Sequence, residues 1–141
     1  MKKMFLVVAS FLVILSGCGT SAPLGEIVYI SYEDYKNMKN EDGAYMVLIS
    51  QTDCSHCIAY KENVLDDYLH NHEITVYELN VTNEENPRAV FTSLSEELGM
   101  GFQGTPATII IENKEIKELI SGEISTTELD EIVTDYQLDN K

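Results

Sequence analysis

Residues 44–57 read AYMVLISQTDCSHC, and this stretch decides the fold. Its first seven residues are almost all apolar, which predicts a strand that is buried on both faces. From Cys54 to about His70 apolar residues recur with helical spacing, which predicts a helix directly after that strand. The two cysteines, Cys54 and Cys57, therefore lie where a buried strand is followed by a helix N-terminus.

The spacing of these cysteines has chemical consequences. A Cys-x-x-Cys pair at a helix start places both sulfur atoms within one helical turn, close enough for a disulfide. Free amide N–H groups and the helix dipole stabilise a thiolate at Cys54. Cys57 lies one turn further inside and is expected to be more buried. We therefore predict a redox-active pair in which Cys54 attacks and Cys57 resolves, with a structural disulfide as the alternative.

Strands and helices alternate on both sides of this stretch. Runs of β-branched and aromatic residues predict strands, and capping motifs such as Ser31-Tyr-Glu-Asp34 and Asn86-Pro87 predict where helices begin. The expected strands are 27–30, 44–50, 73–81, 107–112 and 115–120, and the expected helices are 31–42, 54–70, 86–98 and one from Ser125. The order β-α-β-α-β-α-β-β-α predicts an α/β fold with a central mixed sheet flanked by helices.

Two further segments point to a known family. Gly104-Thr105-Pro106-Ala107-Thr108 opens the penultimate strand, and residues 74–80 read ITVYELN. With the cysteine pair, they resemble the thioredoxin-like superfamily over about residues 26–138. The resemblance implies that Pro106 follows a cis peptide bond and faces the cysteines, while Thr105 hydrogen-bonds an incoming peptide. It also implies a protein disulfide oxidoreductase that needs no cofactor besides the Cys54–Cys57 disulfide.

The sequence departs from thioredoxin itself at two positions. Thioredoxins carry Trp before the first cysteine, where this chain has Asp53, and a buried aspartate six residues before that cysteine, where it has Leu48. In the family that aspartate is thought to relay a proton to the resolving cysteine. Glu78 shares a strand face with Val76, so it is a candidate to lie beneath Cys57 and replace the aspartate. The alternative is a glutamate that reaches solvent near the strand end.

His56 bears on the direction of electron flow. A histidine precedes the second cysteine in the oxidising members of the superfamily, and an imidazolium beside a thiolate raises the reduction potential. Asp53 and the acidic background oppose this effect. An oxidase or isomerase is therefore slightly favoured, and a reductase supplied by a membrane electron donor stays open.

The N-terminal sequence predicts a location outside the cytoplasm. Two lysines precede twelve mostly apolar residues, and residues 15–18 read LSGC, which resembles the lipobox of bacterial lipoproteins. The resemblance implies a signal peptide at 1–17, acylation of Cys18, a lipidated tether at 18–25 and a thioredoxin-like domain at 26–141. We expect a protein held on the outer face of the cell membrane by lipid, with a membrane electron donor or acceptor as partner.

Charge excludes one class of partner. The 141 residues carry a net charge of −15, and from Cys18 onward 7 basic residues face 24 acidic ones. A surface this acidic repels phosphate backbones, so no nucleic-acid partner is expected. Protein thiols and disulfides remain the expected substrates.

Three other functions compete with this interpretation: a zinc site, a copper chaperone and a non-catalytic accessory protein. Cys54, Cys57, His70 and His72 contain zinc-ligand residue types, but the histidines are spaced too closely and lie ~20 Å along the helix from the cysteines. We therefore expect no metal site, with both histidines capping a helix end. A thioredoxin-like copper chaperone and a non-catalytic accessory lipoprotein, such as the bacteriocin-transport accessory type, are the open alternatives.

Overall fold

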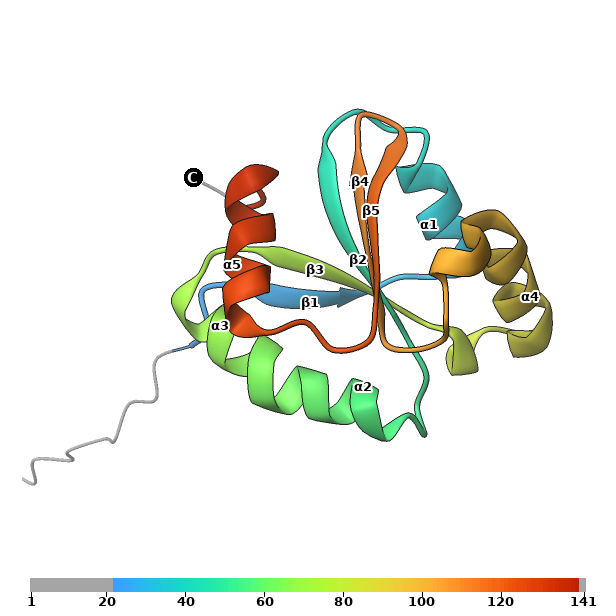
Figure 1. Ribbon diagram of the computed structural model, residues 1–141, viewed down its shortest axis with the longest axis horizontal. Coiled ribbons are helices and arrows are strands. Elements are labelled where there is room, and N and C mark those ends of the chain that lie inside the picture. Colours follow the sequence, from blue (N-terminus) through green and yellow to red (C-terminus); the bar gives the residue numbers. More distant parts are fainter. Residues whose placement is uncertain (1–21, 140–141) are drawn as a thin grey trace, which may run out of the picture.

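The computed structural model describes residues 22–139 (Figure 1). A five-stranded sheet has the order β1-β3-β2-β4-β5, with β1, β3 and β2 parallel and with β4 and β5 antiparallel to their neighbours. The elements are β1 (Glu26–Tyr29), α1 (Tyr32–Met38), β2 (Ala44–Ser50), α2 (Ser55–Tyr60), α3 (Asp66–Asn71), β3 (Thr75–Asn80), α4 (Pro87–Leu98), β4 (Ala107–Glu112), β5 (Glu115–Ser121) and α5 (Thr126–Asp135). This architecture confirms the predicted mixed sheet and element order.

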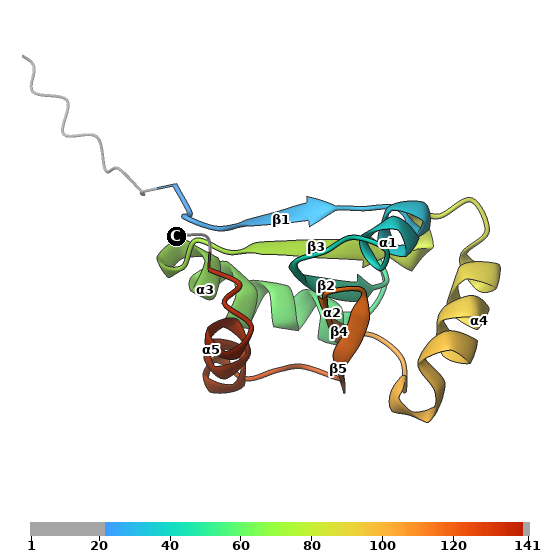
Figure 2. The ribbon, with the colours of Figure 1, turned by 90° about the horizontal axis from the view of Figure 1, so that it is seen from above.

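Helices cover both faces of the sheet (Figure 2). Leu48 of β2 belongs to the apolar cluster shared with α2, α3 and α5, whereas its neighbours Val47 and Ile49 belong to the cluster shared with α1 and α4. Burial on both faces removes apolar surface from water on each side of β2, which stabilises the fold. It also explains why residues 44–50 are almost continuously apolar.

Local signals set most element boundaries. Ser31 and Ser125 each form a capping box, with Asp34 and Glu128 respectively, and Pro87 occupies the first turn of α4. The predicted helix at 54–70 is more complex than expected, because a π-helical turn at Lys61–Leu65 joins α2 to α3. Helical periodicity cannot reveal this turn, since an irregularity of one residue barely changes the apolar pattern.

The N-terminal segment is described only in part. The expected signal peptide and Cys18 lie outside the described residues. At the end of the expected tether, the backbone N–H groups of Leu24 and Gly25 both donate to the carbonyl oxygen of Leu69, at 3.0 and 2.9 Å. Gly25 is packed so closely that an added Cβ would lie 2.5 Å from the Ile74 carbonyl oxygen. Contacts with the domain therefore begin two residues before its expected start. Within residues 22–139, no helix has the length and apolar character needed to span a membrane.

Candidate active site

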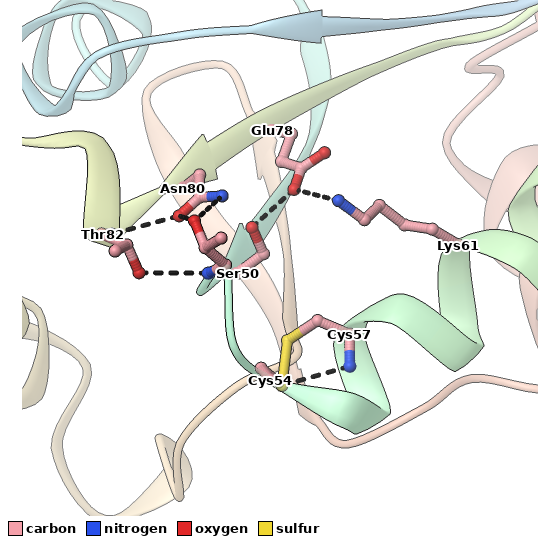
Figure 3. A network of polar contacts seen from close by, with 8 residues as sticks. Ser50, Cys54, Cys57, Lys61, Glu78, Asn80 and Thr82 are labelled. Atoms are coloured by element: carbon pink, nitrogen blue, oxygen red, sulfur yellow. Dashed lines mark hydrogen bonds and ion pairs between the residues drawn. A yellow bond between two sulfur atoms is a disulfide. The ribbon is translucent and has the colours of Figure 1, made fainter.

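The two cysteines form a disulfide at the start of α2 (Figure 3). Cys54 is the N-cap residue, and its Sγ accepts a hydrogen bond from the backbone N–H of Cys57 at 3.1 Å. Cys57 is fully buried, whereas Cys54 is partly exposed. The expected asymmetry between an accessible first sulfur and a sheltered second one is therefore present, and an N-terminal amide already points at the first.

A hydrogen-bonded turn connects β2 to this helix (Figure 3). The Thr52 backbone N–H donates to Thr82 Oγ1 at 3.1 Å, and the Asn80 side-chain amide donates to Thr52 Oγ1 at 3.2 Å. Asn80 also caps the 3₁₀ turn at Val81–Asn83 by accepting from the Thr82 N–H. Groups at the end of β3 therefore fix the path of the chain just before Cys54.

The proline loop lies against the first sulfur. The Thr105–Pro106 peptide bond is cis, as predicted, and the Thr105 carbonyl oxygen lies 3.4 Å from Cys54 Sγ. The Thr105 hydroxyl donates to Gln51 Oε1 at 3.1 Å, which ties the loop to the segment after β2. A hollow of about 400 Å³ opens beside the loop, lined by His56, Gln103, Gly104, Thr105, Pro106, Ser121, Gly122 and Glu123. The geometry leaves space for a ligand next to the disulfide.

Glu78 is fully buried on the α2 side of the sheet. Its Oε1 accepts hydrogen bonds from Ser50 Oγ at 2.5 Å and from Lys61 Nζ at 2.8 Å (Figure 3). In the sheet register Glu78 of β3 pairs with Leu48 of β2, the position at which thioredoxins carry the buried aspartate. Glu78 therefore lies on the neighbouring strand, directly beside that position. Lys61 follows Cys57 by one helical turn and lies on the same helix face. Cys57 and Glu78 are both fully buried, and Lys61 links the carboxylate to the helical segment that carries Cys57.

Sequence reasoning missed the partners of Glu78. Ser50 is the last residue of β2, and Lys61 lies at the junction of α2 with the π-helical turn. The available signal was the i, i+4 spacing of Cys57 and Lys61, which places a lysine on the helix face that covers the sheet.

Tyr60 is also fully buried, and burial raises the pKa of its hydroxyl to about 12, so the phenol stays neutral at physiological pH.

His56 has a partner that its sequence position did not suggest. Its side chain is 76% exposed, and its Nδ1 lies 2.6 Å from Oε1 of Glu123, in the loop between β5 and α5. The two residues are 67 positions apart, so no local pattern links them. The imidazole therefore pairs with a carboxylate from a distant part of the chain.

His70 and His72 lie at the far end of the α2–α3 helix. Their Nδ1 atoms contact the backbone carbonyl oxygens of Asp66 and Tyr68 at 2.7 and 3.0 Å, as expected for side chains at a helix end. Within the described part of the chain, no group of three or more His, Cys, Asp or Glu side chains is arranged to hold a metal ion.

Comparisons with known proteins place the chain in a family. The model of the thioredoxin-like domain matches residues 32–137, more than half of the chain, so the protein belongs to the thioredoxin-like family. A search of curated protein sequences finds no significant match. The fold and the Cys54–Cys57 disulfide together indicate a redox function of the disulfide oxidoreductase type.

Solved structures agree on the fold. Thioredoxin from Malassezia sympodialis superposes with a TM-score of 0.60 at 16% identity, covering 84% of this chain and 97% of its own. A thioredoxin variant from Halobacterium salinarum gives 0.59 at 15% identity, with coverages of 87% and 99%. A thioredoxin from Nicotiana alata gives 0.58 at 14%, with coverages of 84% and 98%. At these identities the similarity establishes a thioredoxin-like fold.

Proposed function

We propose that this protein is an extracytoplasmic thiol–disulfide oxidoreductase, anchored to the cell membrane by lipid on Cys18, that exchanges disulfides with secreted or surface proteins. The observation that carries the proposal is the position of Cys54. Its partly exposed sulfur caps a helix, lies 3.4 Å from the Thr105 carbonyl oxygen, and is bonded to a fully buried partner, Cys57.

The proposed reaction is two successive exchanges. The Cys54 thiolate attacks one sulfur of a substrate disulfide, forming a mixed disulfide and releasing the other substrate sulfur as a thiolate. Cys57 then loses its proton and attacks Cys54 Sγ, which releases the second substrate sulfur and forms the Cys54–Cys57 disulfide. Two electrons pass from the protein to the substrate. The reverse sequence oxidises a substrate dithiol.

The surrounding residues have proposed roles in these steps. The N–H of Cys57, already directed at Cys54 Sγ, stabilises the attacking thiolate. Glu78 accepts the proton of Cys57 during the resolving step, and Lys61 and Ser50 hold its carboxylate in place. The Thr105–Pro106 loop aligns the substrate backbone beside the sulfur.

The location and the electron partner rest on the sequence. The lysine pair, apolar run and LSGC motif support export and lipid attachment, and more than one acyl chain anchors a domain stably. A membrane donor or acceptor then resets the cysteine pair after each cycle. His56 favours an oxidase or isomerase, because its imidazolium stabilises the reduced thiolate form.

A trapping experiment tests the proposal. Removal of the resolving sulfur in Cys57→Ala leaves the mixed disulfide on Cys54 with no internal exit, so covalent complexes with secreted proteins are expected to accumulate. The matched variant Cys54→Ala retains only the buried sulfur and is expected to accumulate none. Complexes should disappear on reduction with dithiothreitol. If the two variants trap equally little while both remain folded, the proposed oxidoreductase function is wrong.

A further inference from the structure

Two hollows lie close to Cys54, which lines one of them and is 3.4 Å from the carbonyl oxygen of Thr105, a residue that lines the other. The first, of about 400 Å³, is lined by His56, the Thr105–Pro106 loop and Glu123. The second, of about 330 Å³, is lined by Gln51, Asp53, Cys54, Thr82 and Pro87. Successive side chains of an extended peptide point in opposite directions. When a client cysteine reaches Cys54 Sγ, the side chains two positions before and after it therefore point the same way as the cysteine, towards the surface that holds the two hollows.

Each hollow carries one carboxylate. Glu123, 41% exposed, lies at the wall of the first, and the exposed Asp53 lies at the wall of the second. Among the residues lining either hollow, His56 is the only one that can carry positive charge, and its Nδ1 is already 2.6 Å from Glu123. Arg88 follows Pro87 in sequence but does not line the second hollow.

The background charge acts in the same direction. The chain has a net charge of −15, and a groove lined by charge of one sign raises the local concentration of ligands of the opposite sign. Anionic client segments are correspondingly repelled, which is how electrostatic complementarity provides specificity. We expect Glu123 to contribute more to this selectivity than Asp53, because it lines the same hollow as the Thr105–Pro106 loop and its carboxylate is in contact with His56.

We propose that Glu123 and Asp53 make the site selective for client cysteines with lysine or arginine two positions away, with Glu123 as the principal specificity-determining residue. A client ammonium or guanidinium group binds in the first hollow and shares the Glu123 carboxylate with His56. A second cationic neighbour lies against Asp53. This inference rests on the proposed function and defines the class of client on which it acts.

Three peptides of five residues test the inference. Each is a disulfide-linked homodimer of a peptide with a central cysteine, and the two positions two residues away from it are both lysine, both serine or both glutamate. The reduced protein is mixed with each peptide, the reaction is quenched with acid, and the second-order rate constant is measured. Dividing each value by the rate constant of dithiothreitol with the same peptide removes the intrinsic reactivity of the disulfide.

The normalised rate constants are expected to rank lysine above serine above glutamate. At low salt the lysine peptide should exceed the serine peptide by about three- to tenfold, and the ratio should approach one near 0.5 M salt, where screening is strong. Glu123→Gln should remove most of the ratio and Asp53→Asn a smaller part. Glu131→Gln on α5 makes the same change in net charge away from the site, and it should retain the ratio.

Two results would overturn the inference. One is equal normalised rates for all three peptides. The other is a preference for lysine that Glu123→Gln and Glu131→Gln reduce equally, because the selectivity would then belong to the overall field. Failure of the proposed function is distinguishable, since in that case the serine peptide itself would not be reduced.

Discussion

Lys61 donates a hydrogen bond to the buried carboxylate of Glu78 across 2.8 Å, and it does so from the helix that carries Cys57 one turn earlier. The lysine side chain is 27% exposed, whereas the glutamate side chain is completely buried. A buried charge needs a partner and hydrogen bonds to offset its desolvation. Lys61 provides the opposite charge, and Lys61 and Ser50 both donate hydrogen bonds to the Oε1 atom of Glu78. The Oε2 atom has no hydrogen-bond partner among the described residues.

The role of Glu78 as a proton acceptor predicts a specific kinetic defect. Glu78→Gln should slow the resolving step by about a hundredfold near neutral pH, the lower end of the range for general base catalysis. The defect should shrink at alkaline pH, where the Cys57 thiol ionises without help. Single-turnover release of the second substrate thiol, measured as a function of pH, checks this. If the pH profile of this rate in Glu78→Gln has the wild-type shape, Glu78 does not accept the proton. Glu131→Gln serves as the control.

The ion pair predicts a difference between single and double variants. Lys61→Met leaves the Glu78 carboxylate buried without its cation and should lower the free energy of unfolding by about 3 kcal/mol, the low end of the range for a broken buried pair, because Lys61 is partly exposed. Adding Glu78→Leu should restore most of this loss, because an apolar pair replaces the stranded charge. Urea denaturation measures both.

A surface ion pair provides the matched control for the Lys61 variant. Lys117→Met breaks the contact of Lys117 with Glu115 and should cost less than about 1 kcal/mol. If Lys61→Met costs no more than Lys117→Met, the carboxylate of Glu78 is not held as described.

His56 and Glu123 should shift the reduction potential in opposite directions. His56→Ala removes a cation that favours the thiolate form and should lower the potential, by up to about 30 mV because the side chain is largely exposed. Glu123→Gln removes the carboxylate that offsets the imidazolium and should raise it by a smaller amount. Equilibration with glutathione buffers measures both potentials. Shifts of the same sign in the two variants would contradict the paired arrangement.

Stability is predicted to fall at alkaline pH. Burial raises the pKa of Tyr60 from 10 to about 12, so between these values the unfolded state loses its proton while the folded state keeps it. This difference in pKa contributes about 2–3 kcal/mol to the free energy of unfolding. The contribution is fully present below pH 10 and is lost as the pH rises towards 12. Tyr60→Phe should flatten the decline measured by denaturation above pH 10.

Other buried tyrosines account for the rest of the fall in stability above pH 10. Burial also raises the pKa of Tyr35 and Tyr68, so Tyr60→Phe should reduce the alkaline decline without abolishing it. An unchanged slope in Tyr60→Phe would show that ionisation of Tyr60 does not contribute.

Local and periodic features of the sequence predicted most of the fold. The apolar run at 44–50 identified the strand buried on both faces, and Ser31 and Ser125 marked helix starts because their hydroxyls satisfy free N–H groups. The helix start at Cys54 was expected from the apolar pattern, and the structure shows that Cys54 is the N-cap residue. The π-helical turn at Lys61–Leu65 was missed, because it leaves the apolar pattern intact.

The site was predictable only where the chemistry is local or carried by a family motif. The Cys54–Cys57 disulfide and the cis bond before Pro106 were expected from a short motif and a resemblance. The partners of Glu78 and His56 come from other elements, and tertiary packing alone brings them together. The contact between His56 and Glu123 spans 67 positions, so no spacing rule could have predicted it.

The central claim is that the Cys54–Cys57 pair is redox-active, and a redox titration tests it most directly. The protein is equilibrated in thiol–disulfide buffers, free thiols are alkylated, and the fraction of disulfide is read by mass spectrometry. We predict a reversible two-electron transition with a midpoint between about −270 and −120 mV, the range of thioredoxin-like oxidoreductases. A disulfide that stays intact below about −300 mV would be structural, and it would contradict the account.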